Sequence, residues 1–174
     1  FKENANQIRT FELFEKNILI AGFGRIGKKL IKRCLAFDSK VYVYDPYVDV
    51  SVIKKYGGIK INNIEEGLEI ADFVSLHMPL TPETKDLINY SIIKKMKNSA
   101  ILVNTARGGI INEDDLEKAL NENLLFGAAL DVFAKEPVET NNPLLKNKKV
   151  ILSPHSATFT DECTSRMSIE TTKN

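Results

Sequence analysis

The stretch "GFGRIG" (residues 22–27) directly follows the apolar run "NILIA" (residues 17–21). Three glycines at this spacing, behind a strand and at the start of a helix, predict a turn that brings the backbone against a phosphate. Gly22 permits the tight turn, Gly24 leaves room for a pyrophosphate, and Gly27 lets helix and strand pack closely. The stretch therefore predicts a dinucleotide site with the pyrophosphate at the positive end of a helix. A glycine turn without a ligand is the alternative.

Short apolar runs alternate with amphipathic segments along the rest of the chain. The runs are rich in β-branched and aromatic residues and apolar on both faces, which is typical of strands in a buried parallel sheet. Strands are expected at residues 17–23, 40–45, 59–61, 73–78, 100–105, 127–133 and 150–153. Helices are expected over residues 26–37 and behind Asn112, a residue type that caps helix starts. This alternation predicts an α/β fold, a doubly wound parallel sheet of the Rossmann type.

Asp45 closes the second predicted strand, "VYVYD", 23 residues beyond Gly22. An acidic residue at this place accepts hydrogen bonds from the adenosine ribose hydroxyls and repels a 2′-phosphate. The position predicts NAD rather than NADP as the cofactor. An ordinary solvated aspartate after a strand is the alternative.

The composition narrows the class of protein. The chain has 174 residues, 43% of them hydrophobic and 27% charged, with a formal net charge of +1. A charge so close to zero predicts no nucleic-acid partner and no membrane surface, and no apolar run is long enough to cross a membrane. The two cysteines, Cys34 and Cys163, have no metal-ligand spacing and are too few for a disulfide scaffold. We therefore expect no metal and a cytoplasmic setting.

Polar residues follow three of the later predicted strands. Arg107 stands in "NTARGG", Asp131 and Glu136 stand in "ALDVFAKEP", and His155 stands in "SPHSAT". Ligands of open α/β sheets bind at the carboxyl ends of the strands, so these side chains are expected on one rim. Arginine grips a carboxylate with two parallel hydrogen bonds, and an imidazole titrates near neutral pH. Each residue alone has an ordinary surface role as its alternative, but the set predicts a catalytic site.

With these motifs in order, the chain resembles the NAD-binding domain of the D-isomer-specific 2-hydroxyacid dehydrogenases, from about Lys16 to about Ala157. The resemblance rests on the strings "GFGRIG", "VYDPY", "HMPLTPET", "NTARGGIINEDDLEKAL", "ALDVFAKEP" and "SPHSAT". It implies hydride transfer between NAD(H) and a small 2-hydroxy or 2-keto acid, with 3-phosphoglycerate as one candidate substrate.

The resemblance also implies roles for individual residues. Arg107 binds the substrate carboxylate and carbonyl, Glu136 supports the catalytic histidine, and His155 is the proton donor. A further group contacts the cofactor: Arg25 and Ile26 at the pyrophosphate, Asp45 at the ribose, Asp131 near the nicotinamide carboxamide, and His77, Met78, Pro79, Thr105 and Ala106 along the nicotinamide. Formate dehydrogenases share the fold but carry glutamine at the position of Glu136, so the glutamate favours hydroxyacid chemistry.

Members of this family have a second, substrate-binding domain. On this basis we expect residues 1–16 to be a linker or stub of that domain, residues 17–158 the cofactor domain, and residues 159–174 the start of an interdomain helix. The isolated piece is expected to bind NAD and turn over poorly, and a homodimer through the cofactor domain is expected. The alternative is a corepressor-type module on the same fold, in which NAD promotes dimerisation without significant turnover.

Overall fold

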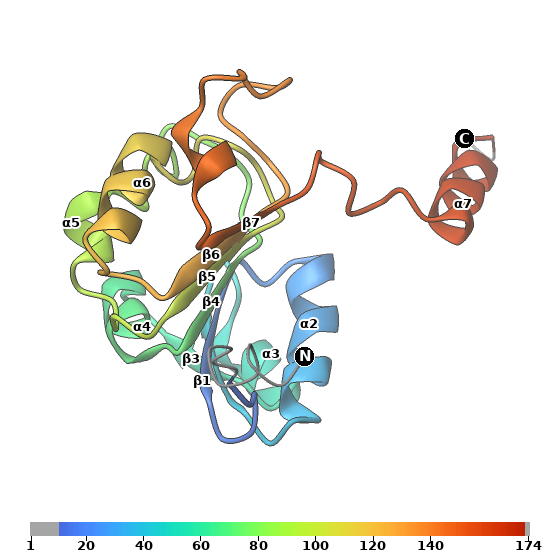
Figure 1. The fold of residues 1–174 in the computed structure, drawn as a ribbon. Coiled ribbons are helices and arrows are strands. Elements are labelled where there is room, and N and C mark those ends of the chain that lie inside the picture. Colours follow the sequence, from blue (N-terminus) through green and yellow to red (C-terminus); the bar gives the residue numbers. More distant parts are fainter. Residues whose placement is uncertain (1–10, 173–174) are drawn as a thin grey trace, which may run out of the picture.

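The centre of the computed structural model, which describes residues 11–172, is a sheet of seven parallel strands in the order β3-β2-β1-β4-β5-β6-β7 (Figure 1). The strands are β1 (Asn17–Ala21), β2 (Lys40–Tyr44), β3 (Ile59–Ile61), β4 (Phe73–Leu76), β5 (Ile101–Asn104), β6 (Gly127–Leu130) and β7 (Val150–Leu152). Strand order reverses at β1, which pairs with β2 on one side and β4 on the other. This reversal opens a crevice at the carboxyl ends of β1 and β4, the usual ligand position of such sheets.

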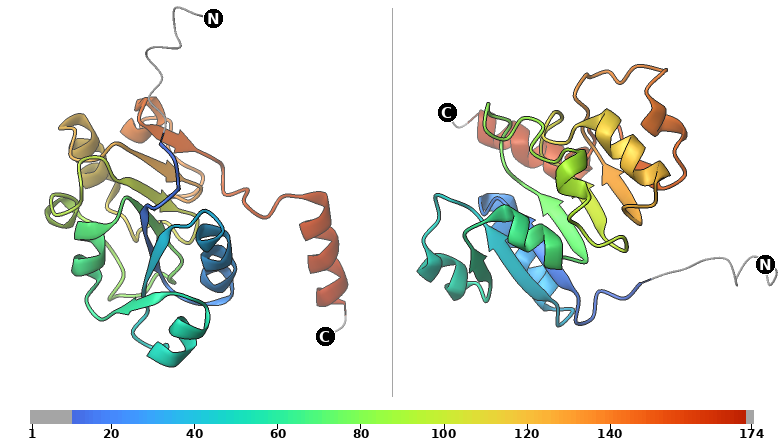
Figure 2. Two further views of the ribbon diagram at one scale, coloured as in Figure 1. Left: turned by 90° about the horizontal axis from the view of Figure 1, so that it is seen from below. Right: turned by 90° about the vertical axis from the view of Figure 1, so that its left-hand side faces the viewer.

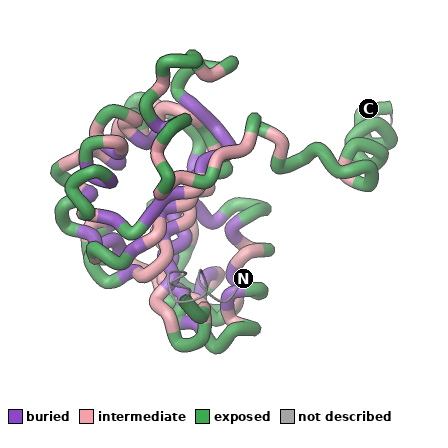
Figure 3. The backbone as a smooth tube through the Cα atoms, viewed as in Figure 1, coloured by how far each residue is buried: buried purple, intermediate pink, exposed green. Residues whose placement is uncertain are grey.

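Helices cover the two faces of the sheet unequally. In Figure 1, α2 (Arg25–Leu35) and α3 (Val50–Lys55) lie on one face, and α4 (Ile64–Ile70), α5 (Tyr90–Ile93) and α6 (Glu113–Asn121) lie on the other. Two buried clusters follow this division, and the burial pattern of Figure 3 traces them along the strands. The smaller cluster lies under α2 and α3, around Phe23 and Ile31, and the larger lies under α4, α5 and α6, around Leu102 and Leu116.

The sequence-based expectation of a doubly wound parallel sheet is confirmed, and the differences lie at the ends of the elements. The runs 17–23, 73–78 and 127–133 are strands only as far as Ala21, Leu76 and Leu130. Their last residues leave the sheet and form the loops of the carboxyl edge. The first helix begins at Arg25 and ends at Leu35, instead of spanning residues 26–37.

The capping prediction for Asn112 is confirmed. Its side chain accepts a hydrogen bond of 3.0 Å from the backbone N–H of Asp115 in the first turn of α6. The apolar stripe behind the cap faces the sheet, with Leu116, Ala119 and Leu120 all buried. The spacing of apolar residues alone therefore fixes which side of α6 packs inward.

The two ends of the described chain differ in their contacts with the rest of the fold. Residues 1–10 of the expected stub lie outside the described residues; Phe11 packs its ring edge-to-face on Phe126, with centroids 4.7 Å apart. At the other end, α7 (Asp161–Thr171) buries none of its residues and projects away from the sheet (Figure 2). A short 3₁₀ helix, η1 (Pro143–Lys146), precedes β7.

Membrane-spanning helices and metal-ligand clusters were both unexpected from the sequence, and the structure bears on them within residues 11–172. No helix there is long and apolar enough to cross a membrane, and no group of three or more potential metal-ligand side chains gathers there. Both cysteines are free, and Cys34 is buried on the inward face of α2, within the smaller apolar cluster.

Candidate active site

The glycine turn joins β1, β4 and α2 at close range. Gly22 has a φ of 101°, and a side chain there would lie 2.6 Å from the carbonyl of His77. A side chain at Gly27 would lie 2.4 Å from the carbonyl oxygen of Gly22. Both positions exclude any larger residue, because backbone atoms cannot move aside as flexible side chains do.

Gly24 differs from these two glycines in facing open space. A Cβ built there meets no atom within 4 Å. Gly24 is also the N-cap of α2, where no side chain accepts a bond from the first N–H groups and no acidic residue occupies the first turn. Free N–H groups at the positive end of an 11-residue helix fit the phosphates of a dinucleotide.

Asp45 lies beside the glycine turn. One carboxylate oxygen accepts a hydrogen bond from the N–H of Phe23 (2.7 Å), and the other accepts from Tyr47 (2.9 Å). Each oxygen keeps a second lone pair for a further donor. Asp45 lines a cavity of about 210 Å³ bounded by Gly22, Phe23, Gly24, Tyr44, Pro46, Tyr47, His77, Met78 and Pro79.

A larger cavity of about 600 Å³ continues along the same edge of the sheet. It shares His77, Met78 and Pro79 with the cavity at Asp45. Its walls are Ile26, His77, Met78, Pro79, Thr105, Ala106, Arg107, Asp131, His155, Ala157 and Thr158. The two cavities therefore bring most of the sequence-predicted residues together. Arg25 lines neither cavity, and Glu136 reaches the larger one only through its contact with His155.

His155 and Glu136 form a pair beside the larger cavity. His155 Nδ1 lies 2.7 Å from Glu136 Oε2, and Glu136 Oε1 accepts a bond of 3.0 Å from the N–H of Phe133. The bond to His155, followed by the Phe133 N–H, holds the pKa of Glu136 below its usual value. His155, the third residue after β7, has a φ of 53°, which is an uncommon backbone conformation for a residue other than glycine.

A buried amide builds the turn that carries Arg107. The side chain of Asn104, 2% exposed at the end of β5, accepts from the N–H of Ala106 (3.0 Å) and donates to the carbonyl of Arg107 (2.9 Å). The guanidinium itself is exposed, donates to the Ala106 carbonyl (2.6 Å), and forms no ion pair within the described part of the chain. Its charge therefore remains available to an anion in the cavity.

Asp131, directly after β6, binds the loop that follows β7 and carries His155. It is 3% exposed and accepts bonds from the hydroxyl of Ser153 (2.5 Å) and the N–H groups of Ser156 (2.9 Å) and Ala157 (3.0 Å). Burial by itself raises the pKa of Asp131, but the three donors, helped by the nearby His155, outweigh burial and bring the pKa below its usual value. The carboxylate is ionised and holds the loop in place.

The other histidine has a different environment. His77 Nε2 lies 2.9 Å from the hydroxyl of Ser75, and burial lowers the pKa of His77. A neutral His77 at the junction of the two cavities contrasts with the solvent-accessible His155.

Sequence reasoning missed Asn104 and Ser153. Both stand at the end of a strand, Asn104 closing β5 and Ser153 directly after β7. That position was a usable signal, since a buried polar side chain there requires a partner.

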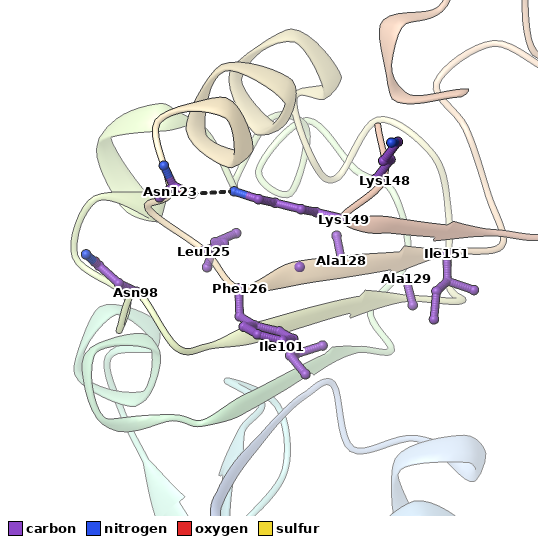
Figure 4. Close-up of a pocket in the computed structure, with 11 residues that line it drawn as sticks. Asn98, Ile101, Asn123, Leu125, Phe126, Ala128, Ala129, Lys148, Lys149 and Ile151 are labelled. Atoms are coloured by element: carbon purple, nitrogen blue, oxygen red, sulfur yellow. Dashed lines mark hydrogen bonds between the residues drawn. The ribbon is translucent and has the colours of Figure 1, made fainter. Parts of the chain in front are cut away.

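A further hollow, of about 520 Å³, lies at the opposite edge of the sheet, where β5, β6 and β7 begin (Figure 4). Its walls are mainly apolar, and the amine of Lys149 is bonded to Asn123 (2.7 Å) and to the carbonyl of Leu120 (2.5 Å). None of the predicted site residues lines it.

The parallel sheet and the groove along its carboxyl edge together define a dinucleotide-binding domain of the Rossmann class. Residues 2–157 match the family model described as the NAD-binding domain of D-isomer specific 2-hydroxyacid dehydrogenases. The chain belongs to this family of NAD-binding domains.

Relatives and solved structures agree with this assignment. The chain is 42% identical over 156 residues to a D-3-phosphoglycerate dehydrogenase of Methanocaldococcus jannaschii, covering 90% of this chain and 30% of the relative. It is 44% identical over 156 residues to a glyoxylate reductase of Thermofilum pendens, covering 90% and 46%. The structure of a D-lactate dehydrogenase from Aquifex aeolicus complexed with NAD and lactic acid superimposes with a TM-score of 0.87 at 34% identity, covering 96% of this chain and 54% of that one. The chain thus spans half or less of the length of the curated relatives it matches.

Proposed function

We propose that this chain is the cofactor domain of an NAD-dependent dehydrogenase that interconverts a 2-hydroxy acid and the corresponding 2-keto acid. The main support is the hydrogen bond of 2.7 Å between His155 and Glu136, beside a cavity that His155 shares with Arg107. An acid–base pair and an unpaired guanidinium at one cavity suit the reduction of a carbonyl that carries a neighbouring carboxylate.

Arg107, His155 and Glu136 each have a distinct role in this proposal. Arg107 binds the substrate carboxylate and stabilises negative charge that grows on the carbonyl oxygen. His155 gives a proton to that oxygen from Nε2, because its Nδ1 is bonded to Glu136. Glu136 stays ionised, since its pKa is lowered, and stabilises the positive charge of the donor ring and its orientation.

The glycine turn and Asp45 hold the cofactor in the proposal. The free N–H groups of α2 and the bare Gly24 face the pyrophosphate, with Arg25 and Ile26 beside it, and Asp45 accepts from the ribose. The nicotinamide side is lined by His77, Met78, Pro79, Thr105, Ala106 and Asp131. When bound, NAD(H) supplies or accepts the hydride.

A panel of 2-keto acids tests the activity in the longest gene product that contains this chain. Relatives named glyoxylate reductase and D-3-phosphoglycerate dehydrogenase indicate glyoxylate and the 2-keto acid of 3-phosphoglycerate as the first substrates to try. NADH oxidation should fall by roughly 10²–10⁴-fold in His155→Gln, the usual contribution of a positioned acid. Lys148→Gln, at the opposite edge of the sheet, is the matched control and should retain full activity.

The same gene product can be used to test the alternative hypothesis, a corepressor-type binding module. NAD-dependent dimerisation with no turnover of any 2-keto acid would favour the corepressor-type module over the dehydrogenase. The proposal also includes a cytoplasmic homodimer formed through this domain, with residues 17–158 as the domain and residues 159–174 leading out of it. Sedimentation of the protein with and without NAD, and cell fractionation, test these points.

A further inference from the structure

The turn at residues 133–134 precedes Glu136 and is held from three sides. Its Phe133 N–H donates to Glu136 Oε1 (3.0 Å), and its Ala134 N–H donates to Glu113 Oε1 (2.6 Å). Its Phe133 carbonyl lies against Gly108. Glu136 is thus attached to a turn whose position is set by residues outside the loop.

Gly108 brings two loops into backbone contact: the loop after β5, which carries Arg107, and the loop after β6, which carries Glu136. A Cβ at Gly108 would lie 1.7 Å from the Phe133 carbonyl oxygen and 2.6 Å from the Ala134 nitrogen. Gly108 directly follows Arg107, so this contact fixes the spacing between the guanidinium loop and the loop of the Glu136–His155 pair. Any side chain at this position would push the two loops apart.

Glu113 holds the same turn from the first residue of α6. Its Oε1 accepts from Ala134, and its Oε2 accepts from the side-chain amide of Asn142 (2.7 Å). The cap of α6 is supplied by Asn112, so the helix start does not depend on Glu113. Its neighbour Asp114 is exposed and carries the same charge in the same helix turn.

We infer that Glu113 and Gly108 are positioning residues, which fix the turn at residues 133–134 and thereby set where Glu136 holds His155 relative to Arg107. The inference rests on the proposed function for its effect on turnover. The position of the Glu136–His155 pair can also be measured without turnover.

Ring-nitrogen NMR shifts of His155 report its bond to Glu136 directly. The sequence has two histidines, so His77→Gln assigns the signals, and His77 serves as an internal reference. Glu113→Ala should move the His155 ring signals toward those of a freely solvated histidine, and Asp114→Ala should leave them unchanged. Glu113→Gln retains an acceptor for the Ala134 N–H and should restore most of the wild-type shifts. Wild-type His155 shifts in Glu113→Ala would overturn the inference.

Steady-state kinetics should distinguish the effect of Glu113 from that of Gly108. Glu113→Ala should lower kcat about tenfold, the equivalent of one charge-assisted hydrogen bond, with little change in KM for the keto acid. Gly108→Ala should lower kcat/KM by about 10²-fold and also raise KM, because both loops move by an ångström or more. The dissociation constant for NAD should stay unchanged in both variants. In both variants the pH dependence of kcat should also shift, because Glu136 no longer holds His155 in its wild-type position. An unchanged pH profile, as expected of a variant that only lost folded protein, would overturn the inference.

Failure of the proposed function has a different outcome. If the wild-type protein reduces no 2-keto acid, the dehydrogenase proposal fails, and the NMR comparison of Glu113→Ala with Asp114→Ala still decides the positioning role.

Discussion

The cavity at the carboxyl edge of the sheet and the hollow at its amino edge are similar in size, about 600 Å³ and 520 Å³, but their walls differ in kind. The carboxyl edge carries Arg107, Asp131 and His155 and adjoins the open start of α2. The amino edge is mainly apolar. Its Lys149 satisfies a carbonyl near the end of α6 and an asparagine side chain.

Helix polarity explains this difference. Helices that follow parallel strands begin at the carboxyl edge, where their free N–H groups attract anions. They end at the amino edge, where free carbonyls attract lysines and disfavour anions such as a substrate carboxylate. Cavities of similar volume therefore differ in chemistry according to the edge of the sheet at which they lie, and substitutions at the two edges should have different effects.

After His155, the largest effect is expected at Arg107. Arg107→Lys keeps the charge but removes the fork geometry, so kcat/KM for the keto acid should fall about 10²-fold. NAD affinity, measured by titration calorimetry, should change little if Arg107 binds the substrate, as we propose, and not the cofactor. Equal loss of NAD and substrate affinity would contradict this division of the cavity.

Asp131 should determine much of the stability of the carboxyl edge. Asp131 is buried and accepts from three donors, so Asp131→Asn, which has fewer acceptor lone pairs, should lower the free energy of unfolding at neutral pH by about 1–3 kcal/mol.

The pKa of Asp131 is lower in the folded chain than in the unfolded chain, so its contribution to stability is complete above the unfolded pKa of about 3.9. That contribution should disappear as the pH falls through the folded pKa. Urea unfolding at a series of pH values should show that the free energy of unfolding falls more steeply with acid in wild type than in Asp131→Asn. Parallel curves for the two proteins would contradict the stabilising role of the Asp131 carboxylate.

Asp45 should set cofactor preference at the far end of the groove. Asp45→Arg should weaken NAD binding about tenfold and shift the preference toward NADP, because the carboxylate and its repulsion of a 2′-phosphate are lost. Asp45→Asn is the matched variant, since it retains an acceptor for the Phe23 N–H. If the ratio of the affinities for NAD and NADP is unchanged in both variants, Asp45 does not bind the ribose.

The smallest effect is expected at the amino edge. Ile151 is 76% exposed in the middle of β7 and lines the hollow there. Ile151→Ser should change the free energy of unfolding by no more than about 0.5 kcal/mol and leave NAD affinity intact. A clear loss of NAD binding in this variant would break the contrast between the two edges.

Much of the fold could be predicted because its signals are local. The apolar runs gave all seven strands with errors only at their ends, and Asn112 marked the start of α6. The strand ends were misplaced because residues such as Val132 and Phe133 are apolar and buried without belonging to the sheet. Burial in a loop and burial in a strand leave the same pattern in the sequence.

The supporting residues of the site could not be predicted in the same way. Asp131 binds Ser153 across 22 residues, and Glu113 binds the Ala134 N–H across 21. The sequence pattern of Glu113 indicated only an acidic residue at a helix start, and that of Gly108 only a turn. Their contacts exist because loops from β5, β6 and β7 meet at one edge of the folded sheet.

The local sequence specifies the glycine turn, the alternation of strands and helices along the chain, and the chemical types of the residues that follow each strand. Local spacing and burial decide those features, and each depends on residues close together in the chain. Three contacts depend on the folding of the whole sheet: His155 with Glu136, Asp131 with the backbone after His155, and Gly108 with the backbone at Phe133. Those distances are set by the packing of parallel strands side by side, which no single stretch of the chain contains.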